Sequence, residues 1–190
     1  MGAKLVLLEQ GKDRRLAEPN TLTHFEAALL PHLAAAYNLA RWLARNDHDA
    51  EDLVQEAYLR AFKSFDSFHG GEGRGWILAI VRNTCYSWLQ QSRNQELAQV
   101  FDEEVHTVEG HSRSPETVLL QSAAAQLLRD ALEKLPVEFR EILVLRELEG
   151  MSYREIADVA GIPVGTVMSR LARGRERLQR ELTHPVNKGA

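Results

Sequence analysis

The sequence predicts an all-α protein with two helical domains joined by a flexible acidic linker, the C-terminal domain containing a helix-turn-helix. Apolar residues recur at helical spacing along most of the chain, and no segment has a convincing strand pattern. A polar, acidic stretch near the middle interrupts this periodicity, as a linker would. Near the C-terminus, two short helical patterns flank a glycine turn, which is the layout of a helix-turn-helix.

The domain boundaries are expected where these patterns change along the 190 residues. The predicted parts are an N-terminal arm (1–22), a first helical domain (23–94), a linker (95–113), a second helical domain (114–183) and a tail (184–190). No segment is apolar enough to span a membrane, and the apolar run at the start is too short for a signal peptide. We therefore expect a cytoplasmic protein without membrane insertion.

The first domain is expected to contain three helices, over 23–46, 49–65 and 76–93. Each carries apolar residues at the spacing of a buried helix face. Asp47 or Asp49 is the expected N-cap of the second helix. Between the second and third helices, residues 67–75 contain four glycines and are expected to form a loop.

Two helices are expected to open the second domain, one from Ser114 and Pro115 to about Lys134 and one from Pro136 to Gly150. Serine is a favourable N-cap, and proline suits the first turn of a helix because its missing N–H would have no partner there. Glycine commonly ends a helix, since it adopts the left-handed conformation without strain.

The helix-turn-helix is expected directly after these two helices. Ser152 and Glu155 have the spacing of a capping box at a helix start. Gly161 stands where the chain must reverse, a position that favours a residue tolerant of positive φ. Pro163 then suits the first turn of the second helix.

The second helix of this motif carries two stripes of residues at helical spacing. The apolar stripe, expected to face the core, comprises Val164, Val167, Met168 and Leu171. The exposed stripe comprises Thr166, Arg170, Arg173 and Arg177. A lone arginine stripe is most often a solvated surface, but combined with the cap and the turn glycine it indicates contact with DNA.

The net charge of −4 conceals an uneven distribution of charge. Residues 164–180 contain five arginines and one glutamate, whereas residues 95–118 contain six acidic residues and one arginine. Salt screens charges beyond about 10 Å, so the local arginines decide the attraction to phosphate. The overall acidity is expected to weaken DNA binding by the isolated chain.

The third helix of the first domain mixes aromatic, basic and amide side chains after the glycine-rich loop. The residues concerned are Trp76, Arg82, Asn83, Tyr86, Trp88, Gln90, Gln91 and Arg93. Such a mixture suits single-stranded nucleic acid, because rings stack on bases, amides bind base edges and arginines bind phosphates. The alternative is that Trp76, Ile80 and Trp88 are simply core residues.

The second helix of the first domain has a polar outer face that contains one large apolar residue. This face comprises Glu51, Asp52, Gln55, Glu56, Leu59, Arg60 and Lys63. A solvated surface explains most faces of this kind. Leu59 among the charges instead indicates a docking surface for a partner helix.

Three collinear segments together resemble the extracytoplasmic-function (ECF) group of bacterial sigma-70 RNA polymerase sigma factors. They read DAEDLVQEAYLRAFKSFDSF, GWILAIVRNTCYSWLQ and LPVEFREILVLRELEGMSYREIADVAGIPVGTVMSRLARGRERL, and the resemblance covers about residues 23–182. It implies a transcription initiation factor that binds core RNA polymerase, directs it to specific promoters and promotes promoter melting. It implies neither an enzyme nor a bound cofactor or metal.

The resemblance also assigns roles to individual residues. Contacts with the clamp helices of the polymerase β′ subunit are implied for Asp52, Gln55, Glu56 and Leu59. Contacts with the −10 element, including a base flipped into the glycine-rich loop, are implied for Ser67, Phe68, His69, Arg74, Arg82, Asn83 and Tyr86. Contacts with the −35 element are implied for Val164, Thr166, Ser169, Arg170 and Arg173.

Further partners are implied in the same way: the flap of the polymerase β subunit, promoter DNA and an anti-sigma factor. The linker would pass near the RNA exit path, where Asp102, Glu103 and Glu104 would mimic nucleic acid. The sequence departs from the commoner family pattern at the end of the third helix, where Gln90 and Gln91 stand in a region that is usually richer in arginine.

Two other classes of protein remain open. The first is a standalone helix-turn-helix regulator, although the first domain lacks the pattern of a receiver domain. The second is a metal-responsive or redox protein, because His106 and His111 lie among acidic residues that could bind metal. The single cysteine, Cys85, excludes an internal disulfide, and its place within a helix is more typical of a packed residue than of a redox sensor.

Overall fold

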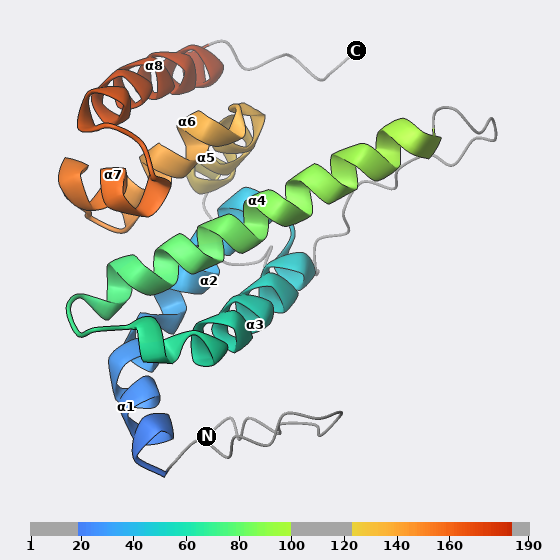
Figure 1. The fold of residues 1–190 in the computed structure, drawn as a ribbon. Helices are drawn as coiled ribbons and strands as arrows, with labels where there is room; N and C mark the ends of the chain where they lie inside the picture. Colours follow the sequence, from blue (N-terminus) through green and yellow to red (C-terminus); the bar gives the residue numbers. More distant parts are fainter. Residues whose placement is uncertain (1–18, 100–122, 184–190) are drawn as a thin grey trace.

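The computed structural model describes residues 19–99 and 123–183, and every regular element in these ranges is helical (Figure 1). The N-terminal domain contains α1 (Pro19–Leu29), η1 (Leu30–His32), α2 (Leu33–Ala44), α3 (Asp47–Lys63), η2 (Phe65–Ser67) and α4 (Gly73–Gln99). The C-terminal domain contains α5 (Ala123–Lys134), α6 (Val137–Leu143), the π-helical η4 (Val144–Leu148), α7 (Tyr153–Ala160) and α8 (Val164–Thr183). The prediction of two all-helical domains is therefore confirmed.

Several expectations concern residues outside the described ranges. They include most of the arm and the linker, the helix start at Ser114, the tail, and the acidic and histidine residues between Asp102 and His111. None of the helices in the described ranges combines the length and the apolar character needed to cross a membrane.

The first predicted helix is in fact two helices separated by the 3₁₀ turn η1. Pro31 lies in this turn. It has no N–H to donate, and its ring clashes with the carbonyl oxygen four residues earlier, so an α-helix does not continue through it. The single helix expected over 23–46 was wrong for this reason. Helix α2 ends at Ala44, and its C-cap residue, Arg45, is in the left-handed conformation with φ 62°.

Helices α3 and α4 both begin earlier than expected. The N-cap of α3 is Asn46, whose side chain accepts a hydrogen bond from the backbone N–H of His48 at 2.9 Å, so neither Asp47 nor Asp49 is the cap. The two aspartates lie in the first turn, where the helix dipole favours negative charge. Helix α4 begins at Gly73 and continues to Gln99, into the segment expected to be linker.

The core of the N-terminal domain lies between α2, α3 and α4. It is formed by fully or almost fully buried apolar residues: Leu39, Leu43, Leu53, Ala57, Ile77, Leu78 and Val81. At one end, the Phe25 ring packs edge-on against Phe62 and Phe65, with ring centroids 5.1 Å and 5.2 Å apart. The hydroxyl of Tyr58 donates to the carbonyl of Leu29 at 2.9 Å, and burial raises the pKa of Tyr58 to about 12. These contacts fix the end of α1 over the start of the glycine-rich loop.

The helix-turn-helix forms as the sequence predicts, except at two positions of its apolar stripe. The capping box of Ser152 and Glu155 is present in full, and Gly161 is in the left-handed conformation with φ 64°. The buried stripe of α8 passes through Val167, Leu171 and Gly174. A Cβ atom on Gly174 would lie 3.2 Å from Leu143 Cδ1, so the glycine allows α8 to pack closely against α6.

Val164 and Met168 were expected to face the core, and this expectation was wrong. Their side chains are 41% and 53% exposed. Met168 is one residue away from the buried stripe, which corresponds to a rotation of about 100° around the helix. Val164 lies in the first turn of α8, which leaves it at the surface.

The two domains pack against each other, with α4 contacting α7 and α2 contacting α6 (Figure 1). Buried residues from both domains form one continuous hydrophobic cluster. The side chain of Arg140, only 2% exposed, donates from Nη2 to the carbonyl of Leu43 at 3.4 Å, near the end of α2. In return, Arg45 Nη2 donates to the carbonyl of Leu135 at 3.5 Å. Burial lowers the pKa of Arg140 to about 10, which leaves it charged at neutral pH at the negative end of the helix dipole.

The close packing of Gly73 leads to a stability prediction. A Cβ atom there would lie 2.4 Å from the backbone oxygen of Ala28, whereas at Gly75 it would meet nothing within 4 Å. We expect Gly73→Ala to lower the free energy of unfolding by about 1–3 kcal/mol through overpacking. Gly75→Ala is the matched control and should leave it unchanged or raise it by up to about 1 kcal/mol. Guanidinium titration followed by circular dichroism measures both, and equal stabilities would contradict the close approach.

Candidate nucleic-acid interface

Two predicted −10 residues of α4, Arg82 and Tyr86, lie on the face of the helix that meets the C-terminal domain, and Asn83 lies beside them. Arg82 Nε donates to Oε1 of Glu141, and the Tyr86 hydroxyl donates to Oε2 of the same carboxylate at 2.7 Å. The Arg82 guanidinium also lies over the Tyr86 ring, 4.3 Å from its centroid. Asn83 is exposed and accepts a hydrogen bond from Arg82 Nη1 at 3.3 Å. This arrangement combines a cation, an aromatic ring and an amide, the side chains that bind unpaired bases and phosphates.

The pKa of the Tyr86 hydroxyl reflects this position between the domains. Burial raises it, and the negative charge of Glu141 raises it further. Arg82 and Arg170 act in the opposite direction. Arg170, predicted to contact the −35 element, is therefore near enough to Tyr86 to influence it.

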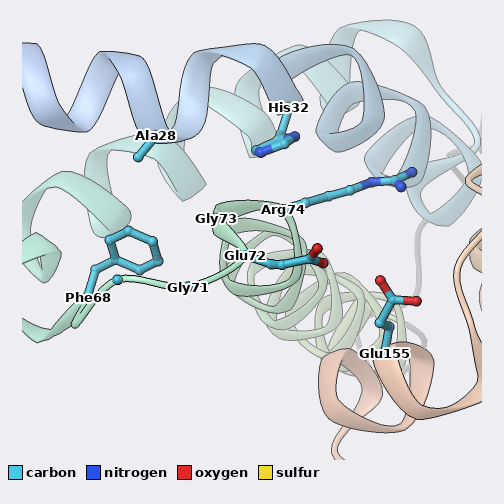
Figure 2. A pocket seen from close by; sticks show the side chains of 9 residues that line it. Ala28, His32, Phe68, Gly71, Glu72, Gly73, Arg74 and Glu155 are labelled. Atoms are coloured by element: carbon cyan, nitrogen blue, oxygen red, sulfur yellow. The ribbon is translucent and has the colours of Figure 1, made fainter.

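The glycine-rich loop borders a cavity of about 470 Å³ between the domains (Figure 2). Its lining includes Ala28 and His32 from the α1 end, Phe68 and the glycines of the loop, Glu72 and Arg74, and Glu155 from α7. The Phe68 ring and the Glu155 carboxylate appear at opposite ends of this view. The aromatic wall and the open glycine backbone provide a surface on which a planar base can stack.

The predicted loop residues have different surroundings. Phe68 is held by stacking on Phe65, at 5.5 Å and 21°, and by contact with the Trp76 ring at 5.2 Å. Ser67 is exposed, but its hydroxyl donates to the carbonyl of Ser64 at 2.6 Å. His69 is exposed. The loop therefore presents one rigid aromatic ring and one imidazole that faces solvent.

Arg74, another residue predicted to belong to the loop site, contacts the C-terminal domain. Its Nη2 atom donates to the Glu149 carboxylate at 2.8 Å and to the Glu149 backbone oxygen at 2.6 Å. The same carboxylate accepts from Asn38 Nδ2 on α2 at 2.6 Å. Arg74 is thus joined to the C-terminal domain, as are Arg82 and Tyr86.

The other aromatic residues of α4 contribute to packing. Trp76, Ile80 and Trp88 are partly buried and pack against the hydrophobic core, which favours the core alternative for these three residues. Gln90, Gln91 and Arg93 are exposed. Cys85 is buried, and burial raises the pKa of its thiol to about 12. A thiol with such a pKa is almost entirely protonated at neutral pH and reacts slowly, which favours the packing interpretation.

The four predicted polymerase contacts share one exposed face of α3. These residues are Asp52, Gln55, Glu56 and Leu59, and all four are exposed. Leu59 is 45% exposed beside the Glu56–Arg60 ion pair. The opposite side of the helix is buried through Leu53, Val54 and Ala57. Helix α3 therefore has one side in the core and one exposed side that carries acidic groups and an apolar residue.

The predicted −35 residues lie along the first half of α8. Val164, Ser169 and Arg173 are exposed, and Thr166 and Arg170 are partly exposed. The exposed Met168 lies among them and belongs to the same surface, although its apolar character suggested the core. Arg177, at the other end of the stripe, is exposed as predicted, and its guanidinium lies 4.7 Å from the centroid of the Phe139 ring.

Three acidic residues at the interface were not identified from the sequence as site residues: Glu141, Glu149 and Glu155. The last was recognised only as part of a capping box. The hydrogen-bond partners of Glu141 and Glu149 on α2 and α4 lie 55 or more positions away along the chain. No local pattern carries that information. Only the packing of the domains brings these carboxylates to the α4 face.

Each of the two domains matches a known family model. A family model for Sigma-70 region 2 matches residues 29–95, and one for Sigma-70, region 4 matches residues 125–178. The ECF RNA polymerase sigma factor SigE of Mycolicibacterium smegmatis is 36% identical over 148 residues, covering 78% of this chain and 57% of that protein. The ECF RNA polymerase sigma-E factor of Haemophilus influenzae is 35% identical over 151 residues, covering 76% of this chain and 79% of that protein.

A solved structure has a similar fold. The sigma factor RpoE of Bartonella quintana, in complex with the anti-sigma factor NepR, matches with a TM-score of 0.68 and 31% identity. The match covers 87% of this chain and 99% of that one. Both family regions are present in order, and a relative at 35% identity is matched over most of its length. The chain therefore belongs to the ECF group of the sigma-70 family, the non-enzymatic initiation factors that direct RNA polymerase to promoters.

Proposed function

We propose that this sigma factor both selects its promoters and melts them, through separate surfaces on α3, α4 and α8. The observation that carries the melting role is the cavity beside the glycine-rich loop, with the Phe68 ring on one side and Arg74 beside it. Extruding a base from a duplex costs a few kcal/mol, so a site that holds the base shifts the balance toward the open promoter. Ser67 and His69 lie next to this cavity along the loop.

The face of α4 would then bind the strand that leaves the duplex. Arg82 would neutralise phosphate, Tyr86 would stack on a base, and the exposed Asn83 would bind a base edge. Gln90 and Gln91 continue the exposed surface beyond these residues. Amides attract phosphate less strongly than arginine does, so phosphate binding would be concentrated near Arg82.

The outer face of α3 is the surface we assign to core polymerase. Asp52, Gln55 and Glu56 provide polar and acidic groups around the exposed Leu59. Such a combination of one apolar anchor and a charged rim is typical of a protein docking surface. The partner would be the clamp helices of β′, while the C-terminal domain would contact the flap of β.

Helix α8 is the surface we assign to the −35 element. Its exposed first half would enter the major groove, with Val164, Thr166, Ser169, Arg170 and Arg173 toward bases and phosphates. A bidentate contact between arginine and guanine supplies about 1–3 kcal/mol of discrimination.

We also propose that an anti-sigma factor regulates this protein, and that it acts in the cytoplasm together with the polymerase. The support for a regulator is the likeness to RpoE of Bartonella quintana, whose structure was determined with NepR. Such a regulator could bind the exposed surfaces of α3 and α8.

The first test of the proposal is transcription of a pooled promoter library by core polymerase with and without the protein. New start sites that share paired upstream motifs are the expected result. A folded protein that binds duplex DNA tightly without polymerase and directs no new starts would instead be a standalone regulator.

The melting role predicts a selective defect for Phe68→Ala. We expect transcription from duplex promoters to fall by tenfold or more, because stacking on one base contributes about 1–3 kcal/mol. Transcription from the same promoters carrying a pre-formed bubble should fall much less. Phe68→Tyr keeps the ring and is the control. Equal losses on both templates would count against base capture and indicate general damage to the fold.

The separation of surfaces predicts opposite defects for two variants. Arg170→Ala should weaken recognition of the −35 element by about 1–3 kcal/mol and reduce the salt dependence of promoter binding, with polymerase binding unchanged. Asp52→Ala combined with Leu59→Ala should weaken polymerase binding instead. Fluorescence anisotropy with labelled promoter and labelled core enzyme separates the two effects. The assignment of surfaces would be wrong if both folded variants lost the same function.

A further inference from the structure

Helix α8 carries an exposed apolar flank beside the residues that we assign to the −35 element. This apolar flank comprises Val164, Met168 and Ala172, which recur every four residues and are all exposed. Met168, at its centre, is 53% exposed, and Val164 is 41% exposed. The helix contacts α5, α6 and α7, which lie on one side of it (Figure 1). Packing against these helices involves the buried stripe of α8 and leaves the apolar flank at the surface.

A polar flank lies on the other side of the same exposed surface. It comprises Thr166, Arg170 and Arg173. At about 100° per residue, Met168 and Arg173 lie roughly 140° apart around the helix. Gly165 and Ser169, both exposed and small, lie between them, so the helix backbone can approach a ligand closely between the two flanks. The first half of α8 therefore presents cations and apolar groups side by side.

The apolar group that base edges present in the major groove of DNA is the C5 methyl group of thymine. Guanine, adenine and cytosine present hydrogen-bond donors and acceptors there. An apolar side chain pressed against those polar groups removes them from water without replacing their hydrogen bonds, which is unfavourable. Against a thymine methyl group, the same side chain buries apolar surface of both partners, which is favourable. An apolar flank in the major groove therefore favours thymine.

Met168 suits such a contact better than its neighbours on the flank. Its side chain is long, unbranched and polarisable, so it can adapt its shape to a methyl group. It also lies at the middle of the flank, one helical turn from Val164 and one from Ala172. From Val164 to Ala172 the helix rises about 12 Å, which matches the height of about three or four stacked base pairs. The flank is therefore long enough to follow more than one base pair of the element.

The neighbours of the apolar flank indicate which ligand it contacts. Isolated exposed apolar residues are common on proteins and need no ligand. This flank, however, shares two helical turns with Thr166, Arg170 and Arg173, so a ligand that covers one flank lies beside the other. The arginines attract phosphate, and a helix placed in the major groove brings both of its flanks close to base edges. Duplex DNA is therefore the ligand that suits both flanks.

We propose that the apolar flank, with Met168 at its centre, selects thymine in the −35 element by contact with the C5 methyl group. The inference rests on the proposed function of α8 and adds a base preference to it. The polar flank would bind guanine edges and phosphates, while the apolar flank would bind one or more T·A pairs next to them. Promoters selected from the pooled library should therefore share at least one thymine in the −35 element.

The test uses holoenzyme assembled from core polymerase and the full-length chain. The probe is a fluorescein-labelled duplex with the −35 element of a selected promoter, and each thymine of either strand is replaced in turn by deoxyuridine. Deoxyuridine lacks the methyl group but keeps every hydrogen-bonding group of thymine. We expect anisotropy to show about fourfold weaker binding for at least one replacement, the equivalent of about 0.8 kcal/mol for one methyl group. Unchanged affinity at every thymine would overturn the inference.

Met168→Ala identifies the side chain that makes the contact. The variant should bind the thymine duplex about fourfold more weakly and show no further loss with deoxyuridine, because the methyl group then has no partner. A loss that persists unchanged in the variant would overturn the role of Met168. The matched control is Leu148→Ala, since Leu148 belongs to the same domain and is 51% exposed but lies in η4. This control should bind both duplexes as the unmodified chain does.

Arg170→Ala separates failure of this inference from failure of the proposed function. If it weakens binding to the −35 element while deoxyuridine has no effect, the inference alone is wrong. If neither change alters binding, the assignment of α8 to the −35 element is wrong as well. If Met168→Ala weakens the binding of core polymerase and leaves DNA binding by the assembled holoenzyme unchanged, the apolar flank docks on protein and the inference is overturned.

Discussion

The arrangement of the two domains depends on the pairing of the buried Glu141 carboxylate with Arg82 and Tyr86. A charge with no access to water must find its partners inside the protein, and both partners of Glu141 lie on one helix of the other domain. This requirement fixes α6 against α4. The reciprocal contacts of Arg140 and Arg45 with backbone carbonyls then fix α2 against the same domain.

Helix α4 is able to serve both the core and a ligand because it has two sides. Ile77, Leu78 and Val81 recur on the side that completes the N-terminal core. Arg82 and Tyr86 fall about a quarter to a third of a turn away, at the edge of that apolar stripe. A rigid helix anchored by its core side holds these two residues in fixed positions. Because their positions are fixed, Arg82 and Tyr86 can bind either a carboxylate of the protein or a strand of nucleic acid.

Sequence reasoning succeeded where the deciding interactions are local. The capping box at Ser152 and the left-handed Gly161 depend only on neighbouring backbone, and both appear as expected. It failed where several local signals compete. Asn46 caps α3 in preference to two nearby aspartates, and Pro31 interrupts an otherwise continuous helical pattern. Met168 has the spacing of a core residue, but it lies beside the stripe that α6 and α7 cover.

The sequence by itself determined the helical class, the two domains, the helix-turn-helix and the exposed α3 face, because apolar periodicity and capping act within a few residues. It also indicated which side chains of α4 suit nucleic acid. Only the tertiary structure decided that Arg74, Arg82 and Tyr86 are bound to carboxylates of the other domain. The physical reason is that these pairs join residues 55 or more positions apart, so their energy depends on domain packing and leaves no periodic trace in the sequence.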